Sequence, residues 1–237
     1  MSADTVLVTG AASGMGRTVV ERLAGAGWRV LALDRSAEAL DALAAEVGPA
    51  VVPLVADVVD RAAVTAAVDG LVAGHRLTAV VNCAGIYPPT RLDDYSEDVY
   101  RRVFDVNVLG TLNVTAAAVP HLRAAGGGAV VNFASVDAFA VSPGQLLYSA
   151  SKAAVLSITK SLAIELAPDA IVVNAVAPGW VDTPGNAATG RMAAAAATIP
   201  LGRVAQPDEI AVWVQRLVEP GYVTGETVVI AGGAAMR

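Results

Sequence analysis

The chain has 237 residues, 55% of them apolar, and it carries 22 acidic against 16 basic residues, which gives a formal net charge of −6. This composition supports a sizeable core and excludes disordered and collagen-like chains. Because lysine and arginine form no cluster, the sequence does not favour nucleic acid as a partner.

Seven short runs rich in Val, Leu and Ile predict β-strands. They lie at residues 5–9, 29–33, 51–55, 79–82, 129–133, 171–176 and 227–230. Segments with helical periodicity lie between them, at 14–26, 37–47, 61–73, 96–125 with an interruption near Asn107, 147–167 and 207–218. The strand runs are nearly continuous in apolar character, as expected for strands covered on both faces. The alternation predicts one α/β domain over residues 1–237, a doubly wound (Rossmann) parallel seven-stranded sheet with helices on both faces.

One stretch, residues 182–201, fits none of these helices. It is rich in Gly and Ala and follows a predicted strand, with high helix propensity at 193–197. Long segments of this kind at strand ends often carry function, so we expect a mobile flap over a substrate site.

The sequence also bears on cell compartment. Long uncharged stretches such as 106–122 contain Asn, Gly and Pro, so we expect buried helices and no membrane contact. A first strand that begins at Thr5 leaves no room for a signal peptide, and a single cysteine cannot form an internal disulfide. We therefore expect a cytoplasmic protein.

The first predicted strand runs into a glycine-rich turn and then a helix. Such a turn brings backbone N–H groups and a helix N-terminus up to an anion, and pyrophosphate is its natural ligand. A glycine-rich turn that binds nothing is the alternative reading of this motif alone. The expected contacts are Gly10, Ser13, Gly14, Met15 and Gly16.

Asp34 ends the second predicted strand, 24 residues after Gly10, where an acidic side chain accepts hydrogen bonds from the adenosine ribose. A carboxylate there repels the additional phosphate of NADP, and the glycine turn holds no compensating cation, so NAD is the favoured cofactor. The neighbouring Arg35 is a cation that could bind the additional phosphate, so NADP remains the alternative cofactor. A loop carboxylate or a helix N-cap is the structural alternative for Asp34.

Tyr148 and Lys152 lie four residues apart on a predicted helix, so their side chains share one face. An ammonium beside a phenol lowers the pKa of the phenol, and the chain has only two lysines. Taken alone, such a pair is more typical of a solvated helix surface than of a catalytic site, so the surrounding residues must decide between the two readings.

The surroundings form a pattern that resembles the short-chain dehydrogenase/reductase family over nearly the whole chain. Its most specific parts are the spacing of 13 residues from Ser135 to Tyr148, the four residues from there to Lys152, and the glycine turn. The other matching features are Asn82-Cys83-Ala84-Gly85 after the fourth strand, Asn107, and Pro178-Gly179 after the sixth.

The resemblance implies a catalytic set of Asn107, Ser135, Tyr148 and Lys152. Tyr148 would exchange a proton with the substrate oxygen, and Ser135 would hydrogen-bond that oxygen. Lys152 would hold the nicotinamide ribose hydroxyls and favour tyrosinate. The backbone of Asn107, in an irregular helix, would hold a water that links Lys152 to solvent.

The resemblance also implies further cofactor contacts. Asp57 and Val58 would contact adenine, Thr183 would bond the carboxamide, and Tyr148 and Lys152 count among the cofactor residues as well. The others are Asn82, Ala84, Gly85, Pro178, Gly179 and Val181. Cys83 and Ala231 depart from the usual pattern, in which Asn and Asp are more frequent; neither position is catalytic, so the departures concern support and subunit packing.

Together these features predict an NAD-dependent oxidoreductase that interconverts a secondary alcohol and a ketone, works as a homotetramer or homodimer, and needs no metal. The two histidines and one cysteine have no metal-ligand spacing. A non-redox enzyme of the same fold, performing elimination or epimerisation, and a catalytically silent dinucleotide-binding protein are the alternatives. The complete set of four catalytic residues disfavours both. The pocket expected from residues 137–141, Gln145, Trp180 and the flap does not identify the small-molecule substrate.

Overall fold

The computed structural model describes residues 4–72, 75–219 and 221–235. Its centre is a sheet of seven parallel strands in the order β3-β2-β1-β4-β5-β6-β7. The strands are β1 (Thr5–Thr9), β2 (Arg29–Asp34), β3 (Val51–Val55), β4 (Leu77–Asn82), β5 (Gly128–Phe133), β6 (Ile171–Pro178) and β7 (Thr227–Ile230). The expected α/β doubly wound fold is confirmed.

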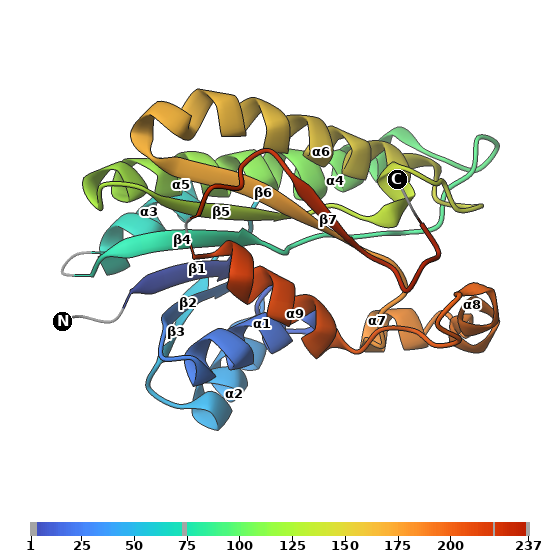
Figure 1. The fold of residues 1–237 in the computed structure, drawn as a ribbon, viewed down its shortest axis with the longest axis horizontal. Helices are drawn as coiled ribbons and strands as arrows, with labels where there is room; N and C mark the ends of the chain where they lie inside the picture. Colours follow the sequence, from blue (N-terminus) through green and yellow to red (C-terminus); the bar gives the residue numbers. More distant parts are fainter. Residues whose placement is uncertain (1–3, 73–74, 220, 236–237) are drawn as a thin grey trace.

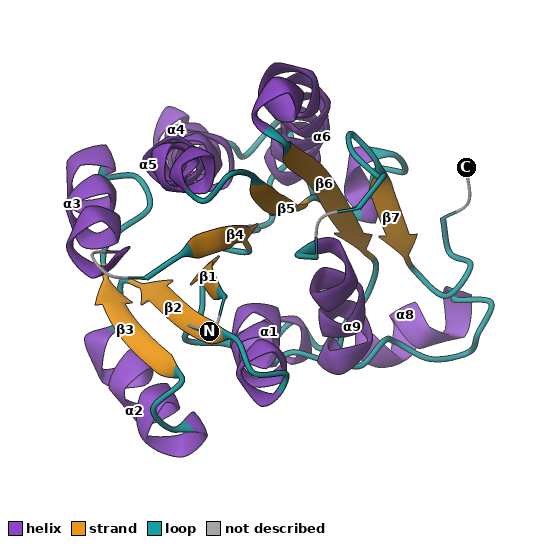
Figure 2. Cartoon of the chain, turned by 60° about the vertical axis from the view of Figure 1, so that its left-hand side comes forward, coloured by secondary structure: helices purple, strands orange, loops and turns teal. Residues whose placement is uncertain are grey.

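Helices cover both faces of the sheet, as Figures 1 and 2 show. On one face lie α1 (Gly14–Gly25), α2 (Ala37–Val47) and α9 (Pro207–Leu217). On the other lie α3 (Arg61–Val72), α4 (Glu97–Phe104), α5 (Gly110–Ala124) and α6 (Leu146–Leu166). Successive side chains of each strand point to opposite faces of the sheet, so the core has two parts, one on each face. In β1, Val6 and Val8 pack toward α1 and α2, while Leu7 packs toward α3 and α5.

Several predicted boundaries differ from the structure. Strand β4 begins two residues earlier than expected, because Leu77 pairs with Thr5, and β6 extends to Pro178, which pairs with Ile230. The predicted helix 61–73 ends at Val72 within the described residues, and its last predicted residue, Ala73, lies outside them. These ends depend on pairing with distant strands, which local propensity does not register.

The long helix expected over 96–125 is interrupted where the sequence analysis placed the break. Residues Asp105–Leu109 form a π-helical turn between α4 and α5. The combined segment is long and apolar enough to cross a membrane by length and composition alone, but 56% of its most apolar window is buried in the fold. This burial fits its position against the sheet and is typical of a core helix.

The predicted flap contains two short helices, α7 (Pro184–Ala187) and α8 (Met192–Thr198). The alanine run at 193–197, for which the sequence indicates high helix propensity, lies within α8, whereas the sequence did not indicate α7. Figure 1 places both helices beyond the ends of the strands, beside the C-terminal part of the chain. The mobility of this segment stays a prediction.

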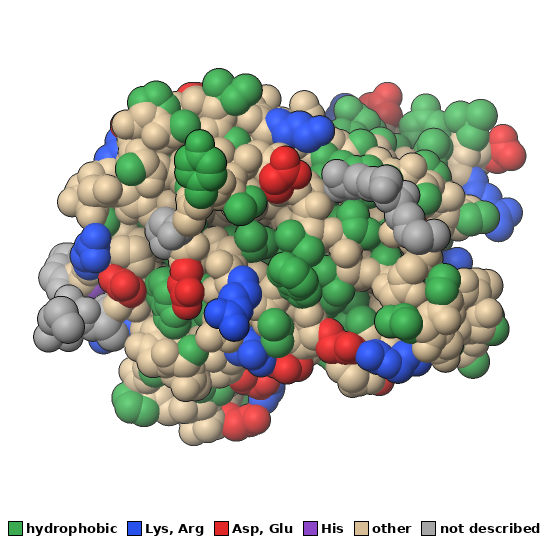
Figure 3. All heavy atoms as spheres, in the orientation of Figure 1, with side chains coloured by type: hydrophobic (Ala, Val, Ile, Leu, Met, Phe, Trp, Pro, Cys, Tyr) green, Lys and Arg blue, Asp and Glu red, His purple; other side chains and the backbone are tan. Residues whose placement is uncertain are grey.

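Strand β7 forms one edge of the sheet and is half-buried along its whole length. Large apolar side chains are exposed at Tyr222 before β7 and at Ile164 on α6. On the face that carries β7, Figure 3 shows apolar side chains open to solvent among charged ones. Exposed apolar side chains of this kind are typical of subunit contacts. They are consistent with the predicted homotetramer or homodimer, which stays a prediction.

Candidate active site

The strand order reverses between β1 and β4, and a crevice outside the carboxyl ends of the strands is expected at this point. A cleft of about 350 Å³ lies there. Twelve of the predicted cofactor residues line it: Gly10, Ser13, Gly14, Met15, Gly16, Asp34, Arg35, Asp57, Val58, Ala84, Gly85 and Thr183. A more open groove of about 500 Å³ between α1 and α9 contains none of the predicted site residues.

The glycine turn is shaped for close approach. Gly10 has a positive φ of 64°, and a Cβ there would lie 2.9 Å from the backbone of Ala84, while a Cβ on Gly16 would collide with the Gly10 carbonyl. Ser13 sits at the N-cap of α1, is exposed, and makes no capping hydrogen bond with its side chain. The turn therefore presents a helix N-terminus and a free hydroxyl to the cleft, which suits a pyrophosphate.

Asp34 is held rigidly beside this turn. Its Oδ2 accepts a hydrogen bond from the backbone N–H of Ala12 at 3.1 Å, and its Oδ1 accepts one from the N–H of Ser36 at 3.2 Å. Each carboxylate oxygen keeps further acceptor capacity, since an ionised carboxylate has about four lone-pair positions. The side chain can therefore accept hydrogen bonds from two adjacent hydroxyl groups, as the predicted ribose contact requires.

The four predicted catalytic residues converge beside the cleft. Lys152 Nζ donates a hydrogen bond to the Phe133 carbonyl at 2.6 Å and lies 5.7 Å from the centre of the Tyr148 ring. A Cβ built on Gly85 would lie 3.3 Å from Asn107 Oδ1 and 3.4 Å from Lys152 Nζ, so both side chains meet at this glycine.

Ser135 completes the cluster from the end of β5. Its Oγ accepts a hydrogen bond from the backbone N–H of Asp137 at 3.1 Å, which leaves the hydroxyl proton free to donate. Hydrogen bonding with the Ser135 side chain lowers the pKa of the Tyr148 phenol. The hydroxyl and the phenol are therefore placed to share one substrate oxygen.

Asn107 is fixed in the π-helical turn through both ends of its side-chain amide. Oδ1 accepts from the Ile86 N–H at 2.8 Å, and Nδ2 donates to the Ile86 carbonyl and to Ser151 Oγ, both at 2.9 Å. Ser151 in turn donates to the Tyr148 carbonyl at 2.7 Å. These bonds connect the loop after β4 to α6 and set the position of the Tyr148 turn.

Burial dominates the electrostatics of the cluster. It lowers the pKa of Lys152 to about 8 and raises the pKa of Tyr148 well above its ordinary value; hydrogen bonding with Ser135 opposes the latter shift. Burial also raises the pKa of Cys83 to about 12, so this residue stays a thiol at neutral pH and is unsuited to nucleophilic attack.

The remaining predicted cofactor residues lie outside the lining of the cleft. Asn82 is buried between the sheet and α5. Its Nδ2 donates to Thr115 Oγ1 of α5 at 3.0 Å and to Asn132 Oδ1 of β5 at 2.9 Å. Val181 is fully buried in the core, and its carbonyl accepts a hydrogen bond from Asn186 Nδ2 at 2.8 Å. Pro178 ends β6, and the N–H of Gly179 bonds the Ile230 carbonyl at 2.9 Å, which joins this corner to β7.

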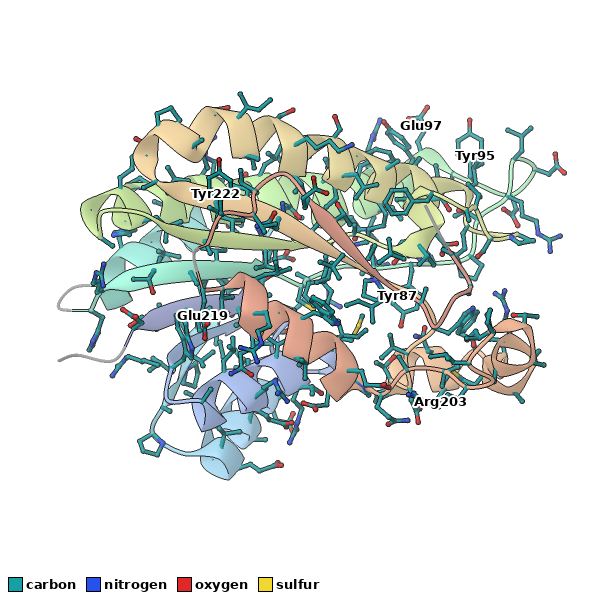
Figure 4. The ribbon with its side chains drawn as sticks, in the orientation of Figure 1. Tyr87, Tyr95, Glu97, Arg203, Glu219 and Tyr222 are labelled. Atoms are coloured by element: carbon teal, nitrogen blue, oxygen red, sulfur yellow. The ribbon has the colours of Figure 1, made fainter. Side chains whose placement is uncertain are left out.

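Two residues that the sequence analysis did not single out also shape the site. Thr9 Oγ1 accepts from the N–H groups of Cys83 and Ala84, both at 3.1 Å, and so ties the end of β1 to the end of β4. Tyr87 packs edge-on against Tyr148 with ring centres 5.9 Å apart and lies toward α7 in Figure 4. The position of Thr9 directly before the glycine turn could have identified it from the sequence. No local sequence feature identifies Tyr87 as a site residue.

The comparison with known proteins agrees with this geometry. Residues 4–194 match the family model described as short chain dehydrogenase. A 3-oxoacyl-[acyl-carrier-protein] reductase from Thermotoga maritima is 40% identical over 96% of both chains. The short-chain reductase protein NovJ from Streptomyces niveus is 38% identical over 97% of this chain and 93% of its own length.

Among solved structures, a 3-ketoacyl-(acyl-carrier-protein) reductase from Brucella melitensis, complexed with NADH, has a TM-score of 0.94 at 31% identity and covers 99% of each chain. The fold, the cleft at the strand ends and the matched sequence thus agree over the length of the chain. The chain belongs to the short-chain dehydrogenase/reductase family of NAD(P)-dependent oxidoreductases.

Proposed function

We propose that this protein interconverts a secondary alcohol and a ketone, with NAD as the preferred cofactor and Tyr148 as the acid/base. The observation that carries the proposal is the convergence of Tyr148, Lys152 and Ser135 beside a cleft lined by a glycine turn. The nicotinamide supplies or accepts the hydride when the cofactor is bound.

The side chains of this protein divide the remaining work. Ser135 donates its hydroxyl proton to the substrate oxygen in place of the Tyr148 phenol and so orients the reacting carbon. Tyr148 donates a proton to that oxygen in ketone reduction and removes one in alcohol oxidation. A charged Lys152 5.7 Å from the ring lowers the free energy of tyrosinate, while Asn107 holds the loop and helix in register.

The preference for NAD rests on Asp34. Its two backbone hydrogen bonds keep the carboxylate at the place where the additional phosphate of NADP would lie, and the resulting charge repulsion favours NAD. Two solved structures of similar Brucella melitensis reductases, one complexed with NADH and one with bound NAD, support this assignment.

The test is a panel of secondary alcohols with NAD and of ketones with NADH, followed by nicotinamide absorbance. Because relatives of this chain include 3-oxoacyl-[acyl-carrier-protein] reductases, a 3-oxoacyl thioester belongs in the panel. Tyr148→Phe should lower turnover by roughly 10²–10⁴-fold and leave NADH binding unchanged. The matched control is Tyr95→Phe, at a tyrosine that is 48% exposed. Near-normal turnover in Tyr148→Phe would contradict the assignment of Tyr148 as the acid/base, whereas a wild type that turns over no member of the panel would favour a non-redox or silent protein.

A further inference from the structure

A carboxylate lies next to the catalytic pair. Asp137 belongs to the 3-10 turn Val136–Ala138, which follows Ser135 directly and packs against α6. Its N–H holds Ser135 Oγ at 3.1 Å, and its Oδ1 accepts a hydrogen bond from the N–H of Ser142 at 3.0 Å. These bonds fix the half-buried side chain, and its other oxygen, Oδ2, receives no hydrogen bond from the described residues.

Asp137 differs in charge from the other groups around the Tyr148 phenol. Lys152 Nζ lies 5.7 Å from the ring centre, the Tyr87 ring packs edge-on against the ring, and Asp137 and Cys83 act on the phenol through their charge. Of these described groups, Asp137 alone is a carboxylate, and its charge raises the pKa of Tyr148. This charge opposes the tyrosinate form, so Asp137 has a role other than activation of the base.

We propose that Asp137 determines substrate specificity: Oδ2 accepts a hydrogen bond from a second hydroxyl group on the carbon next to the reacting carbon. The substrate class is then a neutral vicinal diol and the corresponding hydroxyketone. A partly buried carboxylate with unused acceptor capacity favours a hydroxyl donor and disfavours a substrate carboxylate, because two like charges repel each other. The inference rests on the proposed alcohol–ketone activity.

Three secondary alcohols with a four-carbon chain test this assignment: 2,3-butanediol, 2-butanol and 3-hydroxybutyrate. Asp137→Asn removes the charge while its amide oxygen can still accept from Ser142, so the turn is preserved. Asp41→Asn, at an exposed residue of α2, makes the same change in net charge and serves as the control.

The wild type should favour 2,3-butanediol over 2-butanol by about tenfold in kcat/KM, since a hydrogen bond to a charged group contributes about that much or more. In Asp137→Asn this ratio should fall severalfold, and the ratio of 3-hydroxybutyrate to 2-butanol should rise. The acid limb of the pH profile for alcohol oxidation should also move to lower pH, by about one unit, because tyrosinate is no longer opposed by a nearby charge.

Unchanged ratios among the three alcohols in Asp137→Asn would overturn the inference, as would equal changes in Asp41→Asn. Failure of the proposed function looks different, because the wild type would then bind NADH and turn over no alcohol or ketone of the panel. In that case, the dissociation constants of the three alcohols from the NADH complex, read by nicotinamide fluorescence, test Asp137 directly. Equal preference for diol and mono-alcohol in the wild-type complex would then refute it.

Discussion

The buried ammonium of Lys152 makes a stability prediction with a definite sign. The side chain is 5% exposed, and burial lowers its pKa from 10.5 to about 8. At about 1.4 kcal/mol for each pKa unit, burying the charged form destabilises the folded state by about 3 kcal/mol at pH 7. The unfolded chain keeps the proton up to about pH 10.4, so this penalty is present below pH 8 and disappears between pH 8 and 10.4.

Lys152→Met removes the charge and keeps an unbranched apolar stem. The free energy of unfolding of the variant, relative to wild type, should be greatest at pH 7 and should decline by about 3 kcal/mol by pH 10.4. Loss of the hydrogen bond to Phe133 offsets about 1–3 kcal/mol of the gain at pH 7. Turnover should be lost in this variant. The charged Lys152 therefore lowers the free energy of unfolding of the wild type while it supports catalysis.

Urea unfolding at pH 7, 8.5 and 10, at one protein concentration, measures the difference. Burial raises the pKa of Cys83 and of Tyr148 in the folded protein, so these groups also make stability depend on pH as they titrate in the unfolded chain. Both proteins contain them, so to first approximation their contributions cancel in the comparison. Lys160→Met, at the exposed second lysine of α6, is the control and should show no such pH dependence. A difference between Lys152→Met and wild type that is constant from pH 7 to 10 would refute the reasoning.

Three further predictions follow from the cleft and the surface. Asp34→Ala should narrow the preference for NAD over NADP in kcat/KM, and an unchanged ratio would contradict the charge argument. Gly185→Ala should lower kcat/KM because its Cβ would collide with the Tyr87 hydroxyl; Tyr87→Phe added to it should restore part of the loss, whereas an additive loss would count against this contact. Light scattering should give two or four times 23.9 kDa, and a mass near 23.9 kDa at micromolar protein would rule out the oligomer.

Local patterns predicted most of the fold because a buried parallel strand and an amphipathic helix each leave a short-range signature. The break near Asn107 was also predicted, and the structure has its π-helical turn there. Strand ends were less accurate, as at Leu77 and Pro178, because pairing with distant strands decides them. The flap was only partly predicted, since the tendency of its alanine run to form a helix competed with its glycine-rich surroundings.

By itself the sequence determined the glycine turn, the acidic end of the second strand and the four-residue spacing that puts Tyr148 and Lys152 on one helix face, because these are properties of contiguous segments. Only the tertiary structure decided which environment each group meets. The lowered pKa of Lys152, the hydrogen bonds of the Asn107 amide with Ile86, and the effect of the Asp137 charge on the Tyr148 phenol arise between different elements of the fold. Burial and charge interaction depend on distances in space, and no local pattern records those distances.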